Sequence, residues 1–308
     1  MQISVNCYLS DDPTRSLVDD FVADLAQLRD EGFRRAWVGQ MPWQADVLTV
    51  LAVALREVDM IEVATGVLPI QNQHPMLLAQ RALTLSSISG GRFILGLGMT
   101  HRVVTQLMWG IPWDKPVRRL GEFLDGLLPL LAGQEANATG EIVTTRGELR
   151  IPNAPAPQVY IAALGPQMLR LTGRRCAGTV TWMTGPKTLA KHIGPTLRAA
   201  AAEAGRPAGE VRVAALLPVA VTDDVEGLRA QAAEQFAMYG RLPSYRAMLD
   251  REGYHDPQDA ALIGDEKLVT ERIDELRDAG VDEFIGSPFD TSADGRARTR
   301  KLLRDYGN

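Results

Sequence analysis

The chain has 308 residues, of which 45% are hydrophobic and 23% are charged, and its net charge at pH 7 is -5. This composition is typical of a folded acidic protein with a sizeable core, and it argues against a nucleic-acid partner because no basic stretch interleaved with aromatic residues occurs. The sequence starts with a strand-like segment rather than a signal pattern and has no long uninterrupted apolar run, so we expect a cytoplasmic protein with no membrane partner.

The first half of the chain alternates between strand and helix patterns. β-branched and continuously apolar runs predict the strands, whereas apolar residues at helical spacing predict the helices. Pro75 at the start of the third helix and Gly90-Gly91 at its end are typical helix boundaries. The predicted strands span residues 3–9, 36–40, 61–68 and 92–98, and the predicted helices span 14–31, 45–57, 75–89 and 116–132.

The second half continues this alternation after a polar segment at 133–157, in which strand-like residues flank Arg146-Gly147 and predict a β-hairpin. Eight strands and eight helices in strict alternation predict a single (β/α)8 TIM-barrel domain over residues 1–308, with insertions after strands four and seven. The remaining strands are predicted at 159–163, 179–183, 211–221 and 282–287, and the remaining helices at 167–174, 186–204, 265–279 and from 293 onward. A helical segment at 223–251 is the insertion predicted after strand seven.

In such barrels the active site is formed by the loops that follow the strands. These loops are apolar, aromatic and rich in glycine, and they carry almost no carboxylates, which argues against a glycosidase or a metal site. They suit a flat heterocycle and its phosphate, as in a flavin-type enzyme whose cofactor carries the chemistry. The strand ends are Gln40 to Trp43, Thr65 to Val67, Gly98 to His101, Ala162 to Pro166, Trp182 to Pro186, and Pro218.

Cys7 and Cys176 are the only cysteines, and they share no local motif. Their spacing supports neither a disulfide nor a zinc site. We interpret each as a small buried hydrophobic residue and expect no bound metal.

Several motifs together resemble the luciferase-like superfamily, and more closely its actinobacterial branch that depends on the deazaflavin coenzyme F420. The resemblance extends over nearly the whole chain, and its motifs are specific as a set. The general motifs are Thr65-Gly66-Val67, His74-Pro75, Ser89 to Phe93, Leu95 to Gly98, and Ala162 to Pro166. Those typical of one subgroup are Leu97 to Arg102, Thr179 to Pro186, and Leu242 to Leu249.

The resemblance implies a bulge with a cis peptide bond at Gly66-Val67 behind the cofactor ring, and a helix that opens at Gly165-Pro166 toward the cofactor phosphate. Because a deazaflavin has carbon where a flavin has N5, the implied reaction is reversible hydride transfer to or from a small organic substrate. We also expect a homodimer. The residues expected to bind the cofactor are Gln40, Gly66, Val67, Gly98, Met99, Thr100, Ala162, Ala163, Leu164, Gly165, Pro166, Trp182, Thr184 and Gly185.

The sequence departs from the family pattern at the positions that carry acids and bases. Relatives place Asp-His at the end of strand two, where this chain has Gln40 and Met41, and some place an acidic glutamate near the end of strand four. Because His101 lies in that second region and imidazole titrates near neutral pH, we expect His101 to be the proton donor.

Other interpretations remain open. His74 is either a helix cap or a ligand contact, Trp182 either packs in the core or touches the ring, and His192 and His255 are expected on the surface. Gly96-x-Gly98 lacks the third glycine of a Rossmann fingerprint. Lys115, Arg118 and Arg119 mark either a solvated helix start or a site for the acidic tail of F420. FMN is the alternative cofactor, and a non-catalytic flavin-binding or deazaflavin-binding protein is the alternative function.

Overall fold

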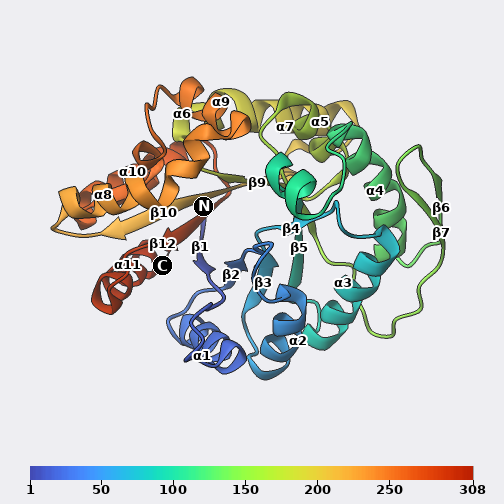
Figure 1. Cartoon of the computed structure of the whole chain (residues 1–308), viewed down its shortest axis with the longest axis horizontal. Coiled ribbons are helices and arrows are strands. Elements are labelled where there is room, and N and C mark those ends of the chain that lie inside the picture. The colour runs from blue at the N-terminus through green and yellow to red at the C-terminus, as the bar shows by residue number, and fades with distance from the viewer. Residues whose placement is uncertain (308) are drawn as a thin grey trace. The chain divides into compact units, whose positions relative to one another are not determined.

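The computed structural model describes residues 1–307, and the chain divides into two compact units. The first unit comprises Met1–Asn6, Glu31–Trp37 and the chain from Ala163 onward, and the second comprises Cys7–Asp30 and Val38–Ala162. Figure 1 labels the helices and strands of both.

The first unit is built on parallel strands around the long strand β10 (Arg212–Val221). Strand β10 pairs with β9 (Gly178–Trp182) and with β12 (Glu283–Pro288), and β12 pairs in turn with β1 (Gln2–Cys7). The other strands are β2 (Arg35–Val38) and β11 (Leu262–Gly264). The helices are α5 (Pro166–Arg175), α6 (Pro186–Thr188), α7 (Gly194–Glu203), α8 (Val225–Phe236), α9 (Pro243–Glu252), α10 (Glu266–Asp278) and α11 (Ala293–Gly307).

The second unit contains the parallel strands β3 (Glu62–Thr65), β5 (Phe93–Gly98) and β8 (Val159–Ala162), with β5 between the other two. The short strand β4 (Leu68–Pro69) also pairs with β5. The antiparallel hairpin is formed by β6 (Ala136–Thr139) and β7 (Thr144–Gly147). The helices are α1 (Leu17–Asp30), α2 (Val47–Glu57), α3 (Pro75–Ser89) and α4 (Pro116–Leu131).

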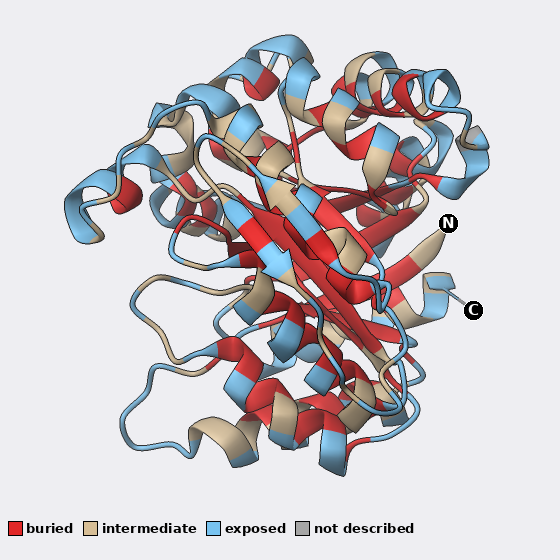
Figure 2. Ribbon diagram, turned by 90° about the vertical axis from the view of Figure 1, so that its right-hand side faces the viewer, coloured by how far each residue is buried: buried red, intermediate tan, exposed pale blue. Residues whose placement is uncertain are grey.

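The core follows from the sequence of the strands. Every residue of β5 is buried, and Arg212 is the single residue of β10 that is exposed. Figure 2 shows most strand segments coloured as buried, whereas the helices alternate between buried and exposed positions. The hairpin strands β6 and β7 are the exception, since most of their residues are exposed or partly exposed. Strands that are covered on both faces require continuous apolar runs, and helices that are covered on one side require a stripe. This pattern and the β/α alternation confirm the predicted (β/α)8 class, with insertions after β5 and β10.

A buried ion pair joins three strands of the first unit. The Glu283 carboxylate accepts hydrogen bonds from Arg35 Nη1 (2.5 Å), Trp37 Nε1 (2.8 Å) and Ser4 Oγ (2.7 Å). All four residues are buried, so the carboxylate is stabilised by these donors rather than by water.

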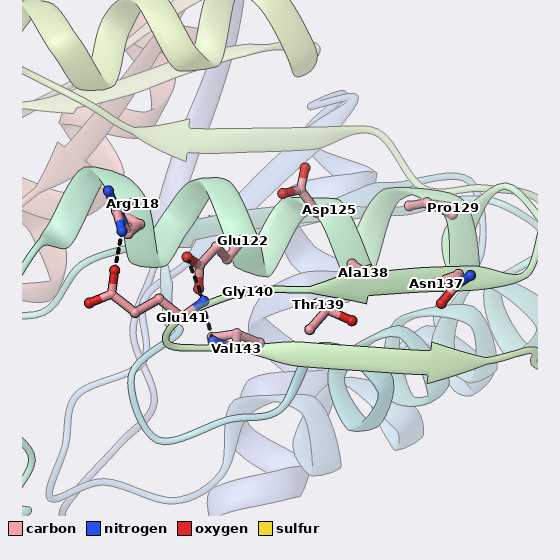
Figure 3. A pocket seen from close by; sticks show the side chains of 10 residues that line it. All are labelled: Arg118, Glu122, Asp125, Pro129, Asn137, Ala138, Thr139, Gly140, Glu141 and Val143. Carbon is pink, nitrogen blue, oxygen red and sulfur yellow. Dashed lines mark hydrogen bonds and ion pairs between the residues drawn. The ribbon is translucent and has the colours of Figure 1, made fainter.

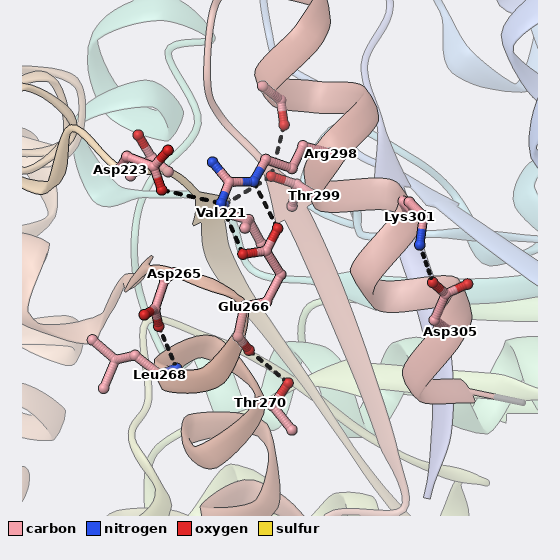
Figure 4. A network of polar contacts seen from close by, with 12 residues as sticks. Val221, Asp223, Asp265, Glu266, Leu268, Thr270, Arg298, Thr299, Lys301 and Asp305 are labelled. Atoms are coloured by element: carbon pink, nitrogen blue, oxygen red, sulfur yellow. Dashed lines mark hydrogen bonds and ion pairs between the residues drawn. The ribbon is translucent and has the colours of Figure 1, made fainter.

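The last helix, α11, is held in its unit by ion pairs and by a backbone hydrogen bond to a side-chain hydroxyl. Arg298 of α11 pairs with Glu266 at 2.7 Å and with Asp223 at 3.1 Å, as Figure 4 shows. The Arg298 guanidinium lowers the pKa of the Glu266 carboxyl to about 2. Beside this pair, Thr299 Oγ1 accepts the Val221 N–H at 2.9 Å at the end of β10.

Three predicted boundaries were wrong in detail. The hairpin turn lies at residues 140–143 rather than at Arg146-Gly147, because the Glu122 carboxylate accepts the N–H groups of residues 141, 142 and 143 there. The strand predicted at 61–68 is interrupted, so that β3 and β4 are separate. The helix predicted at 186–204 runs through α6, a π-helical turn at Leu189–Ile193, and α7.

Candidate active site

The first group of candidate residues lies between β3 and β4 in the second unit. The peptide bond between Gly66 and Val67 is cis, as the family resemblance implied. At the end of β3, the Thr65 hydroxyl accepts the Gly96 N–H and donates to the Gly96 carbonyl, both at 2.8 Å. A side chain therefore connects β3 to β5 at the point where backbone pairing is interrupted.

Two glycines of β5 allow the backbone to approach this bulge. A Cβ atom at position 96 would lie 1.8 Å from the Thr65 carbonyl oxygen. A Cβ atom at position 98 would lie 2.7 Å from Val67 Cγ2 and 3.1 Å from the Ala162 Cβ. Packing therefore requires glycine at both positions. It also brings the candidate residues Val67, Gly98 and Ala162 together.

The loop after β5 carries Thr100 and His101. Both are partly buried, and the His101 carbonyl accepts the Thr105 N–H at 3.0 Å, which starts a helical turn that includes the π-helical residues Val104–Met108. Burial lowers the pKa of the His101 imidazole. The neutral form of the ring therefore predominates at neutral pH, and this imidazole is a weaker base than that of an unburied histidine.

Gln71 lies beside this loop, and the sequence analysis did not select it. Its side-chain oxygen accepts the Thr100 N–H at 3.3 Å, whereas its amide nitrogen is buried and has no hydrogen-bond partner. The residue is 7% exposed. A buried donor without an acceptor costs about 1 to 3 kcal/mol. A carbonyl acceptor on a ligand at Thr100 would therefore suit this amide.

Gln40, another candidate residue, is already engaged by its own loop. Its amide nitrogen donates to the carbonyls of Met41 (2.9 Å) and Ala45 (3.1 Å), and its oxygen accepts the Val47 N–H at 2.8 Å. Gln40 thus closes the loop after β2 and caps the start of α2. Its contribution to a ligand site would be to shape this loop.

In the first unit, the candidate residues Ala163 to Pro166 join β8 to α5. The Ala163 carbonyl accepts a bond from Thr179 Oγ1 at 3.3 Å, which fixes the turn to β9. Gly165 is the N-cap of α5, Pro166 follows it, and no side chain caps this helix. A Cβ atom at Gly165 would meet no protein atom within 4 Å. The start of α5 therefore presents free N–H groups beside open space, as an anion site requires.

The start of α6 is different, although Thr184 and Gly185 were also predicted to hold the cofactor. The Glu252 carboxylate accepts the N–H groups of Lys187 (2.9 Å) and Thr188 (2.7 Å). Gly185 leaves room for this contact, since a Cβ atom there would lie 2.5 Å from Glu252 Cδ. The protein therefore supplies its own anion at this helix start.

Trp182 ends β9 within a cluster of aromatic side chains. Its ring lies 5.9 Å from Phe236 and 5.7 Å from Tyr239, both at edge-on angles, and Tyr239 lies 5.1 Å from Tyr245. The buried Trp182 Nε1 has no hydrogen-bond partner. Met183 follows with a positive φ of 54°, which is unusual for a residue with a long side chain. Trp182 thus packs against the insertion after β10 and leaves a donor free for a ligand.

Three residue groups have structural roles. His74 caps α3 by accepting the Met76 N–H, and its other ring nitrogen lies 3.0 Å from the Thr144 carbonyl oxygen, which supports the helix-cap interpretation. Arg92 donates to the carbonyls of Val58, Ile61 and Leu55. The cations near the start of α4 form ion pairs: Lys115 and Arg118 share the Glu141 carboxylate, and Arg119 pairs with Asp114.

A hollow of about 520 Å³ lies beside α4 and the β6-β7 hairpin (Figure 3). Its lining includes Glu122, Asp125 and Glu141 together with Arg118, and it contains none of the residues expected to bind the cofactor ring or phosphate. Backbone N–H groups hold the pKa of Glu122 below its usual range, although burial raises it. Its carboxylates make this hollow unsuitable for a phosphate-bearing cofactor.

The described residues fit a deazaflavin or flavin better than a metal. Within residues 1–307, no group of three His, Cys, Asp or Glu side chains could hold a metal ion. No helix in the same range is long and apolar enough to cross a membrane. The unpaired amide of Gln71 and the uncapped start of α5 provide donors of the kind that ring carbonyls and a phosphate require.

The comparison that decides the family is a match of residues 10–283 to the model described as luciferase-like monooxygenase. The chain belongs to this family. It is 30% identical over 245 residues to the 5,10-methylenetetrahydromethanopterin reductase of Methanolobus tindarius, which covers 79% of this chain and 74% of the relative. The family resemblance inferred from the motifs is therefore confirmed.

Two solved structures of the same fold support the barrel assignment. The coenzyme F420 dependent tetrahydromethanopterin reductase from Methanopyrus kandleri has a TM-score of 0.81 at 22% identity, covering 99% of this chain and 97% of the other. An F420-dependent secondary alcohol dehydrogenase in complex with an F420-acetone adduct also has a TM-score of 0.81, at 20% identity, covering 100% of this chain and 99% of the other.

Sequence reasoning missed two residues of this family member's candidate site, Gln71 and His192. Gln71 is a polar residue soon after an apolar strand end, and this position could have indicated it. His192 was expected on the surface, but it is half-buried and its Nε2 lies 2.9 Å from the Leu164 carbonyl oxygen. No local pattern predicts that contact.

Proposed function

We propose that this protein is an F420-dependent oxidoreductase that transfers a hydride between the cofactor and a small organic substrate. The observation that carries the proposal is the start of α5, where free N–H groups adjoin open space at Gly165. The reductases and the dehydrogenase to which the chain is similar support the choice of reaction. When bound, F420 would supply the hydride chemistry through its own ring.

The candidate residues of each unit would have their own role. In the second unit, the bulge at Gly66-Val67 would support the ring, and the segment Gly98 to Thr100 with Gln71 would bind its polar edge. In the first unit, the turn Ala163 to Pro166 would bind the phosphate through backbone N–H groups. Trp182 would offer its indole N–H to the ligand. Gly185 would act through the room that it leaves for Glu252, and Thr184 through the hydrogen bond that it donates to the Trp182 carbonyl.

His101 would move the proton that accompanies the hydride. Because burial lowers its pKa, the neutral imidazole would accept a proton from the substrate during oxidation and return it during reduction. A positioned acid or base of this kind contributes roughly 100-fold to 10,000-fold in rate.

Cofactor binding is the direct test. The purified protein is titrated with F420 and, separately, with FMN, and each absorbance spectrum is followed to saturation. We expect F420 to bind more tightly. Binding of FMN at micromolar concentration without binding of F420 would favour the alternative, an FMN-dependent luciferase-like monooxygenase. Binding of F420 without turnover of any alcohol, aldehyde or pterin substrate would favour a binding protein.

The variant Gly165→Ala tests whether the cofactor phosphate binds at the start of α5. Since the added Cβ meets no protein atom, the variant should fold normally and bind F420 more weakly, because the methyl group occupies space that the phosphate needs. Gly121→Ala in α4 is the matched control, since its Cβ also lies in open space. Equal F420 affinity of both variants would place the phosphate elsewhere.

A cytoplasmic homodimer that forms a single luciferase-like domain over residues 1–308 remains part of the proposal. Light scattering of the purified protein tests the dimer, and limited proteolysis tests whether the chain behaves as one domain.

A further inference from the structure

The two helix starts of the first unit that follow β8 and β9 differ in how their N–H groups are satisfied. At α6, the Glu252 carboxylate accepts two of them. At α5, no side chain acts as a cap. At the start of α6 the protein therefore supplies its own anion. At the start of α5 the N–H groups are left for the phosphate of a ligand.

His192 connects these two regions. It lies in the π-helical turn Leu189–Ile193 that continues α6, and its Nε2 lies 2.9 Å from the Leu164 carbonyl oxygen. A carbonyl oxygen only accepts, so Nε2 carries the hydrogen in this contact. The imidazole thus holds the peptide group immediately before the start of α5.

The geometry of that peptide group determines what His192 controls. A trans peptide is planar, and its carbonyl and N–H point in opposite directions. When His192 holds the Leu164 carbonyl on one side, the Gly165 N–H must point to the other side. Among the described residues, this N–H has no backbone partner.

We propose that His192 is a positioning residue for the cofactor phosphate, because its bond to Leu164 directs the Gly165 N–H toward that group. The inference rests on the proposed function, in which α5 binds the phosphate of F420. His192 touches no cofactor atom in this arrangement and acts through the peptide plane.

The test compares two ligands, of which one has the phosphate. F420 carries the phosphate with the acidic tail attached to it, and the parent 8-hydroxy-5-deazaflavin with an unmodified ribityl chain carries neither. His192→Phe fills the same space without an N–H donor. Since one hydrogen bond contributes about 0.5 to 1.5 kcal/mol, this variant should weaken F420 binding roughly two- to thirteenfold and leave the affinity for the parent deazaflavin unchanged.

Two further variants complete the experiment. His192→Gln carries an N–H donor at a similar distance from the backbone and should recover most of the F420 affinity. His255→Phe changes an exposed histidine on a loop and should bind both ligands as the wild type does.

Each other outcome overturns the inference in a distinguishable way. Equal weakening for both ligands in His192→Phe would show that the residue supports the fold rather than the phosphate contact. Unchanged F420 affinity would show that the Leu164 contact has no role in binding. If the wild type binds neither ligand, the proposed function fails and the inference fails with it.

Discussion

The buried carboxylate of Glu283 provides a stability prediction that can be worked out from geometry. Its side chain is 0% exposed and that of Arg35 is 5% exposed. In Glu283→Gln, one oxygen becomes an NH2 group. If this group faces Arg35, it opposes a guanidinium donor; if the amide flips, it opposes the Trp37 and Ser4 donors instead. Neither orientation satisfies all three donors.

The expected loss of unfolding free energy is about 3 to 5 kcal/mol, which is typical when one partner of a buried ion pair is removed. For a urea m-value of roughly 3 kcal/mol/M, the unfolding midpoint measured by circular dichroism should fall by about 1 to 2 M. Asp305→Asn is the control, since Asp305 pairs with Lys301 in solvent and should change the free energy by less than about 1 kcal/mol.

A double variant refines the test. Adding Arg35→Met to Glu283→Gln removes the cation that would otherwise be buried without its partner. The double variant should therefore lose less unfolding free energy than the sum of the losses in the two single variants. If Glu283→Gln shifts the midpoint no more than Asp305→Asn does, or if the two single costs are additive, the carboxylate does not stabilise these strands as argued.

Three more predictions concern His101 and Gly96. His101→Ala should lower turnover at least about 100-fold with F420 affinity nearly intact, and full turnover from about pH 5 to 9 would make His101 a packing residue. Because burial lowers the folded-state pKa of His101 below its ordinary 6.5, its stabilising contribution is present above that pH and is lost as the pH falls through the lowered value. Urea unfolding at a series of pH values should therefore show a smaller acid loss in His101→Gln, and identical pH curves would contradict this. Gly96→Ala should cost about 3 kcal/mol or more, since its Cβ would overlap the Thr65 carbonyl, and a wild-type midpoint would be inconsistent with that overlap.

The alternation of strands and helices could be predicted because a strand that is buried on both faces requires a continuous apolar run, and such a run is visible in the sequence. The apolar run of β5 and the Gly90-Gly91 helix end were sufficient to place these elements. The hairpin was placed wrongly because its turn is determined by Glu122, which lies about twenty residues earlier on α4. A turn stabilised by a distant carboxylate has no local signal.

The candidate site shows the same limit. The glycines of β5 and the start of α5 could be recognised from motifs, since close approach and anion binding require particular residue types. The contacts of Glu252 with α6 and of His192 with Leu164 join segments that are distant in sequence. Each depends on the tertiary arrangement of its partners, which neither spacing nor composition encodes.

The anchoring of the insertion after β10 has a consequence for protein engineering. Phe236 and Tyr239 pack on Trp182, and Glu252 caps the start of α6, so the insertion is joined to the β9-α6 segment by aromatic contacts and by a charged contact. A chimaera that exchanges this insertion between family members would have to transfer both ends together. A graft without an acidic residue at position 252 would leave the N–H groups of Lys187 and Thr188 unpaired, and an unrelated anion would then compete for them.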